Sequence, residues 1–193
     1  MNDHNIRGSH RGAHPADDLE HEHTLILRVL DAAAAELTRV EAGAPLRDGY
    51  WHKYVDFLGR YADEFHHGKE EVVLFAALQT QGMVATSGPI SRMRSEHDET
   101  RGLNARLAEA LTSDDTAMIT HLVLRSIDSL RMHIAWENEV LLPVARETLD
   151  IQVWDMVRRG FDTALTAMGP GFADRYVATA EELCSDSPQA SPA

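Results

Sequence analysis

The chain has 193 residues, of which 44% are hydrophobic, and a formal net charge of −13. This length suits one domain with a sizeable core, and no apolar run approaches the roughly 18 residues that a membrane span needs. The acidic balance argues against nucleic acid and anionic membranes as partners, because both require basic patches. Because the N-terminus is polar and Cys184 is the single cysteine, we expect a cytoplasmic protein without intramolecular disulfide bonds.

The chain shows helical periodicity over most of its length. Residues 1–16 lack any period and are predicted to be disordered. Apolar residues then recur at helical spacing, without the alternation typical of strands. Helices are expected at residues 17–41 and 49–81, from Ser87 to a break at 112–115, and from that break to Leu149. Residues 17–149 therefore predict an all-α domain, an up-down-up-down four-helix bundle.

A helical extension is expected after the bundle, over residues 150–184, followed by a disordered tail at 185–193. The stretch after Asp150 is helical in pattern, is broken at Gly169-Pro170-Gly171, and continues from Phe172. Trp154 and Phe161 give this extension an apolar face. That face fits packing against the bundle, and it also fits docking to a partner protein or pairing of two copies in a homo-dimer.

A doubled motif gives the first indication of chemistry. His67 and Glu71 repeat as His133 and Glu137, in each case as His-x-x-x-Glu followed by apolar residues. Residues four apart lie on one face of an α-helix, so each pair points in the direction of the apolar stripe. A buried carboxylate without a partner costs several kcal/mol. The repeated pair therefore predicts a bound metal.

The remaining two helices each add one inward histidine. A lone histidine on an apolar face is more often a hydrogen-bonded core residue than a ligand, but here one recurs on every helix of the bundle. Inward Glu and His side chains are also how helical bundles build dinuclear carboxylate sites. The predicted metal ligands are His23, His67, Glu71, His97, His133 and Glu137.

A second register competes within the first motif, because His66 and Glu70 have the same spacing as His67 and Glu71. We prefer His67 with Glu71, since the apolar residues Leu74, Phe75 and Leu78 continue that face. His66 with Glu70 would continue to Val73 and Ala77. Surface positions are expected for His21, His52, His121, Glu22 and Glu96.

These segments resemble the hemerythrin family, specifically its HHE cation-binding branch, over about residues 18–147. The matching stretches are Glu22-His23-Thr24-Leu25-Ile26, His66-His67-Gly68-Lys69-Glu70-Glu71, Glu96-His97-Asp98-Glu99 and His133-Ile134-Ala135-Trp136-Glu137. The resemblance implies a non-haem centre of two iron ions, oxo- or hydroxo-bridged. Glu71 and Glu137 would bridge the irons, and the histidines would be terminal ligands. Ferritin-like proteins fit less well, because they use Glu-x-x-His.

One departure from the family pattern bears on function. Oxygen-carrying members place a second histidine four residues after the third-helix ligand, whereas this chain has Arg101 there. The resemblance then implies an open metal position and a reaction with O₂, peroxide or nitric oxide, as a sensor, scavenger or modest oxidoreductase. Arg101 itself is expected either beside the ligands or reaching into solvent. The alternative function is passive holding of iron or zinc, or a metal-stabilised structural or interaction protein.

Overall fold

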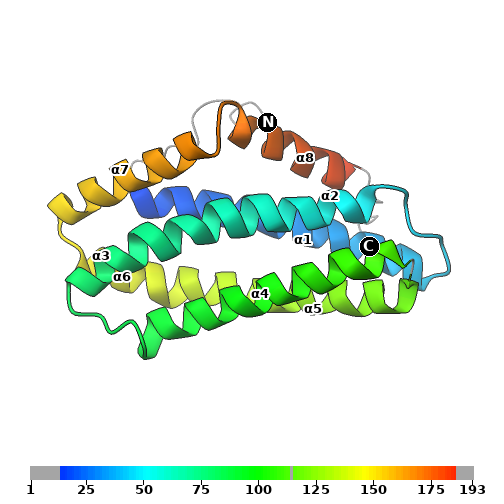
Figure 1. Cartoon of the computed structure of the whole chain (residues 1–193), viewed down its shortest axis with the longest axis horizontal. Coiled ribbons are helices and arrows are strands. Elements are labelled where there is room, and N and C mark those ends of the chain that lie inside the picture. Colours follow the sequence, from blue (N-terminus) through cyan, green and yellow to red (C-terminus); the bar gives the residue numbers. More distant parts are fainter. Residues whose placement is uncertain (1–13, 114, 186–193) are drawn as a thin grey trace, which may run out of the picture.

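The computed structural model describes residues 14–113 and 115–185, and these residues form helices without any strand (Figure 1). The long helices lie side by side along the longest axis of the molecule. The prediction of an all-α bundle is confirmed. The predicted disordered ends fall mostly outside the described residues, namely at 1–13 and 186–193.

The first helix, α1 (Pro15–Glu41), begins two residues earlier than its pattern predicts. Pro15 occupies the first turn, where its missing N–H costs nothing. His14 caps the helix, because its Nδ1 atom accepts a hydrogen bond from the Ala16 N–H at 3.2 Å. Residues 15 and 16 are therefore part of the fold.

The predicted second and fourth helices are not α-helical throughout. The second consists of α2 (Tyr50–Asp56), η1 (Phe57–His67), η2 (Glu70–Leu74) and α3 (Phe75–Thr80). The fourth consists of α5 (Thr116–Trp136), η3 (Glu137–Leu141) and α6 (Leu142–Thr148). The η segments are π-helical, with i→i+5 hydrogen bonds. Because a π-turn holds more residues than an α-turn, side chains there point in directions that an α-helical period does not predict. The third helix, α4 (Gly88–Thr112), is a regular α-helix.

The apolar core is divided into two clusters, and the candidate ligands lie between them. On α1, His23 separates Leu19 of one cluster from Ile26 of the other. The same order holds on α4, where His97 lies between Met93 and Leu103. The second and fourth helices repeat it, with ligands between Phe65 and Leu74 and between Leu130 and Leu141. The site is thus a polar layer within the core.

The predicted extension forms α7 (Ile151–Ala167) and α8 (Phe172–Ser185), which cover one side of the bundle and meet at a corner (Figure 1). Trp154 and Phe161 of α7 are buried in the same apolar cluster as Leu74 and Phe75 of the bundle. These two aromatic side chains therefore serve the packing within the chain. No helix in the described part of the chain is long and apolar enough to cross a membrane.

Candidate metal site

Seven buried side chains from all of the long bundle helices converge at the polar layer. They are His23 of α1, His66 and His67 at the end of η1, Glu70 of η2, His97 of α4, His133 of α5 and Glu137 of η3. Each is at most 2% exposed. The two π-helical segments that supply a glutamate to the site, η2 and η3, begin at that glutamate, which agrees with the frequent use of π-turns at functional sites.

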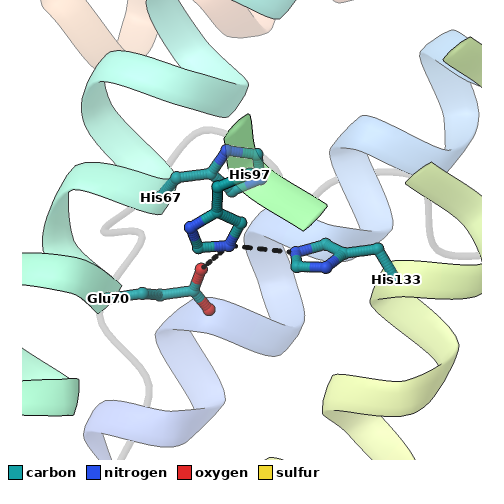
Figure 2. Close-up of side chains that lie close together, drawn as sticks. All are labelled: His67, Glu70, His97 and His133. Carbon is teal, nitrogen blue, oxygen red and sulfur yellow. Dashed lines mark hydrogen bonds and ion pairs between the residues drawn. The ribbon is translucent and has the colours of Figure 1, made fainter. Parts of the chain in front are cut away.

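The seven side chains form two groups whose ligand atoms lie within 4.8 Å of one another. One group, the three-histidine group, contains His67, Glu70, His97 and His133 (Figure 2). The other, the two-histidine group, contains His23, His66, Glu70 and Glu137. Glu70 belongs to both, with Oε1 3.8 Å from His66 Nε2 and Oε2 3.4 Å from His97 Nε2. Glu137 Oε2 likewise lies 3.1 Å from His23 Nε2 and 3.3 Å from His133 Nε2.

The histidines face one another in pairs through their Nε2 atoms. These atoms are 3.0 Å apart in His23 and His66, and 3.2 Å apart in His97 and His133. Two nitrogens that bind one ion at about 2.1 Å and at right angles are also about 3 Å apart. Two bare nitrogen lone pairs at this distance repel each other, so each pair calls for a cation, either a proton or a metal ion.

The outer nitrogens orient the Nε2 atoms toward the centre of the site. Each Nδ1 lies beside an oxygen acceptor, so in the neutral ring the hydrogen is on Nδ1 and the lone pair is on Nε2. The acceptors are Asn138 for His23 (2.7 Å), Glu22 for His66 (2.8 Å), Asp63 for His67 (3.4 Å), Glu71 for His97 (2.8 Å) and Glu96 for His133 (2.9 Å). Such outer partners fix the orientation and basicity of histidine ligands.

The two central carboxylates provide an independent test of metal binding. All four carboxylate oxygens of Glu70 and Glu137 are buried without a hydrogen-bond donor. Buried polar atoms are normally paired, and a buried carboxylate is strongly destabilising when it is not. A cation held by Glu70 and Glu137 together with the histidines would satisfy these oxygens. The residues present therefore fit a metal site.

The charge states within the site show that its carboxylates attract a cation. Although burial alone would raise the pKa of Glu70, His66 and His97 hold it well below its usual range, so this carboxylate is ionised. Burial would lower the pKa of His97, but the carboxylates of Glu70 and Glu71 raise it to about 9. Burial, together with neighbouring His97 and His133, lowers the pKa of His67, which leaves its ring neutral.

The structure changes two members of the predicted ligand set. His23, His67, His97, His133 and Glu137 come together as expected. Glu71, however, lies outside both groups and is 20% exposed, and Glu70 takes the inward position. His66, the rejected alternative, is a member of the two-histidine group. The π-helical winding of η1 and η2 explains the change, because it turns His66, His67 and Glu70 inward together.

The structure corrects the expectation for Glu22 and Glu96 and decides between the two alternatives for Arg101. Glu22 is 6% exposed and, like Glu96, accepts a hydrogen bond from a histidine of the site, so neither is a freely solvated charge. Arg101 does not simply reach into solvent. Its guanidinium donates to Asp63 at 2.7 Å and to Glu71 at 2.9 Å. Arg101 therefore fixes the carboxylates behind His67 and His97.

A cavity of about 370 Å³ lies beside the site, between the bundle and the extension. Glu22 and Lys69 line it, together with Tyr61 and Phe65 of η1, Phe161 of α7 and Ala173 of α8. Because Glu22 contacts His66, the cavity is separated from the two-histidine group by a single side chain.

The fold and the site together define a helical-bundle metal-binding protein. The chain belongs to the family described as the hemerythrin HHE cation binding domain, whose family model matches residues 8–145. The family resemblance seen in the sequence is thus confirmed. The matched range ends before α7, so both helices of the extension lie beyond it.

The chain is similar to curated iron-sulfur cluster repair proteins. The chain is 35% identical over 121 residues to the iron-sulfur cluster repair protein YtfE of Escherichia coli O1:K1 / APEC, covering 58% of this chain and 54% of that protein. It is 36% identical to the protein of the same name from Salmonella newport (strain SL254), with the same coverage. The chain thus spans about half the length of these relatives. No solved structure matches it.

Proposed function

We propose that this chain holds two iron ions, one in each histidine group, and that the loaded site reacts with nitric oxide, peroxide or O₂. The observation that carries this proposal is the position of Glu70, which belongs to both groups. Glu137 lies in the same way beside His23 and His133. Two carboxylates between two sets of histidines suit a pair of neighbouring ions better than one isolated ion.

Iron is proposed on chemical grounds and on the relatives. Imidazole and carboxylate ligands suit iron, and the absence of cysteine from the groups disfavours a structural zinc site of the thiolate kind. The relatives are named as iron-sulfur cluster repair proteins. We therefore infer that the physiological task of this chain is defence against nitrosative or oxidative damage to iron centres.

The two halves of the site share Glu70, and Glu137 also lies beside both His23 and His133, so the halves differ in their histidines. The three-histidine group offers more nitrogen ligands than the group of His23 and His66. Metal sites with fewer protein ligands keep positions for a small molecule. The two-histidine half is thus the proposed site of reaction. This replaces the expectation of four histidines and a vacancy at Arg101, because His66 supplies a fifth histidine.

The chain's own residues prepare the site for such a reaction. Bound iron would supply a redox-active centre with an exchangeable position. The outer acceptors hold each Nε2 lone pair inward, and Glu70 and Glu137 supply negative charge that lowers the cost of concentrating cations. The apolar clusters on both sides exclude water, which strengthens these electrostatic interactions.

The direct experiment loads the chain with Fe²⁺ under anaerobic conditions and then adds nitric oxide or peroxide. The proposal predicts that the absorption spectrum of the loaded protein changes when nitric oxide or peroxide is added. His66→Ala should suppress this change. A loaded protein whose spectrum is indifferent to both reagents, or a chain that binds only redox-silent zinc, would favour passive metal holding instead. Recovery of a nitric-oxide-damaged iron-sulfur enzyme, with and without the chain, tests the inferred task.

A further inference from the structure

Lys69 is a buried cation outside the ligand set. It lies between η1 and η2 and is 2% exposed, although a lysine ammonium is rarely removed from water. Its Nζ atom donates to Glu22 Oε1. The same atom lies 4.3 Å from the ring centre of Phe65 and 4.8 Å from that of Phe161. Lys69 is therefore held by one carboxylate and two aromatic faces.

Glu22 connects this cation to the site. Its second oxygen, Oε2, accepts from His66 Nδ1 at 2.8 Å. Both oxygens of Glu22 are thus engaged, one by Lys69 and the other by His66. Lys69, Glu22 and His66 thus form a continuous hydrogen-bonded chain that ends on the two-histidine group.

Two similar series of hydrogen bonds lead to the three-histidine group, but the cations at their outer ends are exposed. Arg101 donates to Glu71 behind His97, and Arg92 donates to Glu96 behind His133. The side chains of Arg101 and Arg92 are 37% and 47% exposed. Water and salt screen such pairs, whereas a dry pair interacts more strongly. Removing Lys69 should therefore weaken metal binding by His66 more than removing Arg92 weakens metal binding by His133.

The exclusion of water from the Lys69 ammonium depends in part on the extension. Phe161 belongs to α7, which lies beyond the residues matched by the family model. Its ring centre lies 4.8 Å from Nζ, and both side chains line the cavity. The extension therefore contributes directly to the surroundings of a side chain that is connected to the site.

We propose that Lys69 is a positioning residue for the two-histidine half of the site, acting through Glu22 on His66, and that Phe161 of α7 keeps this chain of contacts dry. The proposal rests on the proposed function in that it requires an ion in each half. Loss of an outer partner of a histidine ligand typically weakens metal binding by about 10–100-fold. The effect should be confined to the ion that His23 and His66 hold.

The test measures Fe²⁺ binding under anaerobic conditions, by competition with a coloured chelator, in wild type, Lys69→Met and Arg92→Met. We expect wild type to bind two ions. In Lys69→Met one of the two should bind about 10–100-fold more weakly, and the other should be unchanged. Arg92→Met, the exposed counterpart, should change either affinity by only about threefold or less. Phe161→Ala should weaken the same ion as Lys69→Met, and to a smaller extent.

A second variant separates positioning from simple charge compensation. Lys69→Met alone leaves Glu22 buried without its cation, which can unfold the chain. In Glu22→Gln/Lys69→Met both charges are removed, and the Gln oxygen can still accept from His66. Reduced affinity for one ion in this folded variant supports the proposal. Full wild-type affinity, or equal weakening of both ions, would overturn it. If wild type itself fails to bind two ions, the proposed function fails instead.

Discussion

His66 and His67 are consecutive in the chain, yet they belong to different halves of the site. In an α-helix, consecutive side chains diverge by about 100° and rarely serve one centre. Here the π-helical turn at the end of η1 allows one ring to face His23 and the other to stack on His97, with ring centres 3.9 Å apart. Glu70, four residues after His66, then lies between the halves.

The first prediction concerns which glutamate is shared. Glu70→Gln should reduce iron loading from two ions per chain to one or fewer, because a neutral amide cannot replace a carboxylate that belongs to both groups. Glu71→Gln should retain two ions with affinity reduced by about tenfold, since Glu71 only orients His97. Metal analysis after gel filtration measures the number of irons per chain in each variant. Normal loading of Glu70→Gln together with loss in Glu71→Gln would restore the register preferred from the sequence.

The second prediction concerns metal removal. At a free ion concentration 1,000 times the dissociation constant, one bound ion stabilises the folded state by about 4 kcal/mol. A chelator should therefore lower the melting temperature of the loaded protein by many degrees. Glu137→Gln should shrink this difference, because Glu137 Oε2 lies near both His23 and His133. Calorimetry gives the melting temperature of each protein with and without chelator. If the difference between these two temperatures is the same in Glu137→Gln as in wild type, Glu137 does not take part in metal binding.

The third prediction concerns the docking of α7 on the segment that carries Glu70. A Cβ atom added at Gly160 would lie 2.5 Å from Val73 Cγ1, whereas one at Gly102 would meet nothing within 4 Å. Gly160→Ala should lower the free energy of unfolding by about 1–3 kcal/mol. Gly102→Ala, also within a helix, should leave it unchanged or raise it by up to about 1 kcal/mol.

Denaturant unfolding of the two alanine variants provides the comparison. Val73→Ala should restore most of the loss when it is combined with Gly160→Ala, because it removes the two methyl groups that clash. If Gly160→Ala is as stable as Gly102→Ala, α7 does not approach η2 as closely as described.

The fourth prediction concerns pH. Burial and the nearby Arg146 lower the pKa of His14 below its ordinary value of 6.5. Between that value and the lower folded pKa, the unfolded chain binds a proton that the folded chain does not. The contribution of His14 to stability is therefore complete above about pH 6.5 and is lost as the pH falls.

The matched variant is His14→Asn, which can still cap α1 but does not titrate. Unfolding of metal-free protein at pH 8 and pH 5.5 should show a smaller loss of stability on acidification in this variant than in wild type. An identical loss in both proteins would mean that His14 does not resist protonation.

Much of the fold could be predicted from sequence, because amphipathic periodicity reports directly which face of a helix is buried. The same reasoning placed His23 and His97 on the buried face, and each lies on a regular α-helix between apolar residues of the two clusters. His133 also lies on regular helix, at the last turn of α5. The apolar face of α7 is predictable as well, but the pattern alone does not decide whether Trp154 and Phe161 pack within the chain or against a partner.

The register at residues 66–71 could not be predicted in this way. An α-helical period aligns His67 and Glu71 with Leu78, but the segment is π-helical and this alignment fails. A usable signal was present. Leu74 follows Glu70 by four residues, as Leu141 follows Glu137, whereas Phe75 stands at that step after Glu71. The repeat of His, Glu and Leu at steps of four therefore favours His66 and Glu70. The charges behind the ligands, such as Glu22 with Lys69, depend on contacts between helices that no local pattern reports.

The measurement that tests the account most directly is the iron content of the chain after anaerobic loading, measured together with a Mössbauer spectrum. The account predicts two irons per chain in two distinct environments, because one half offers three histidines and the other offers two. It also predicts that the signal of the two-histidine half changes first when nitric oxide is added. One iron per chain, or two irons in identical environments, would contradict it.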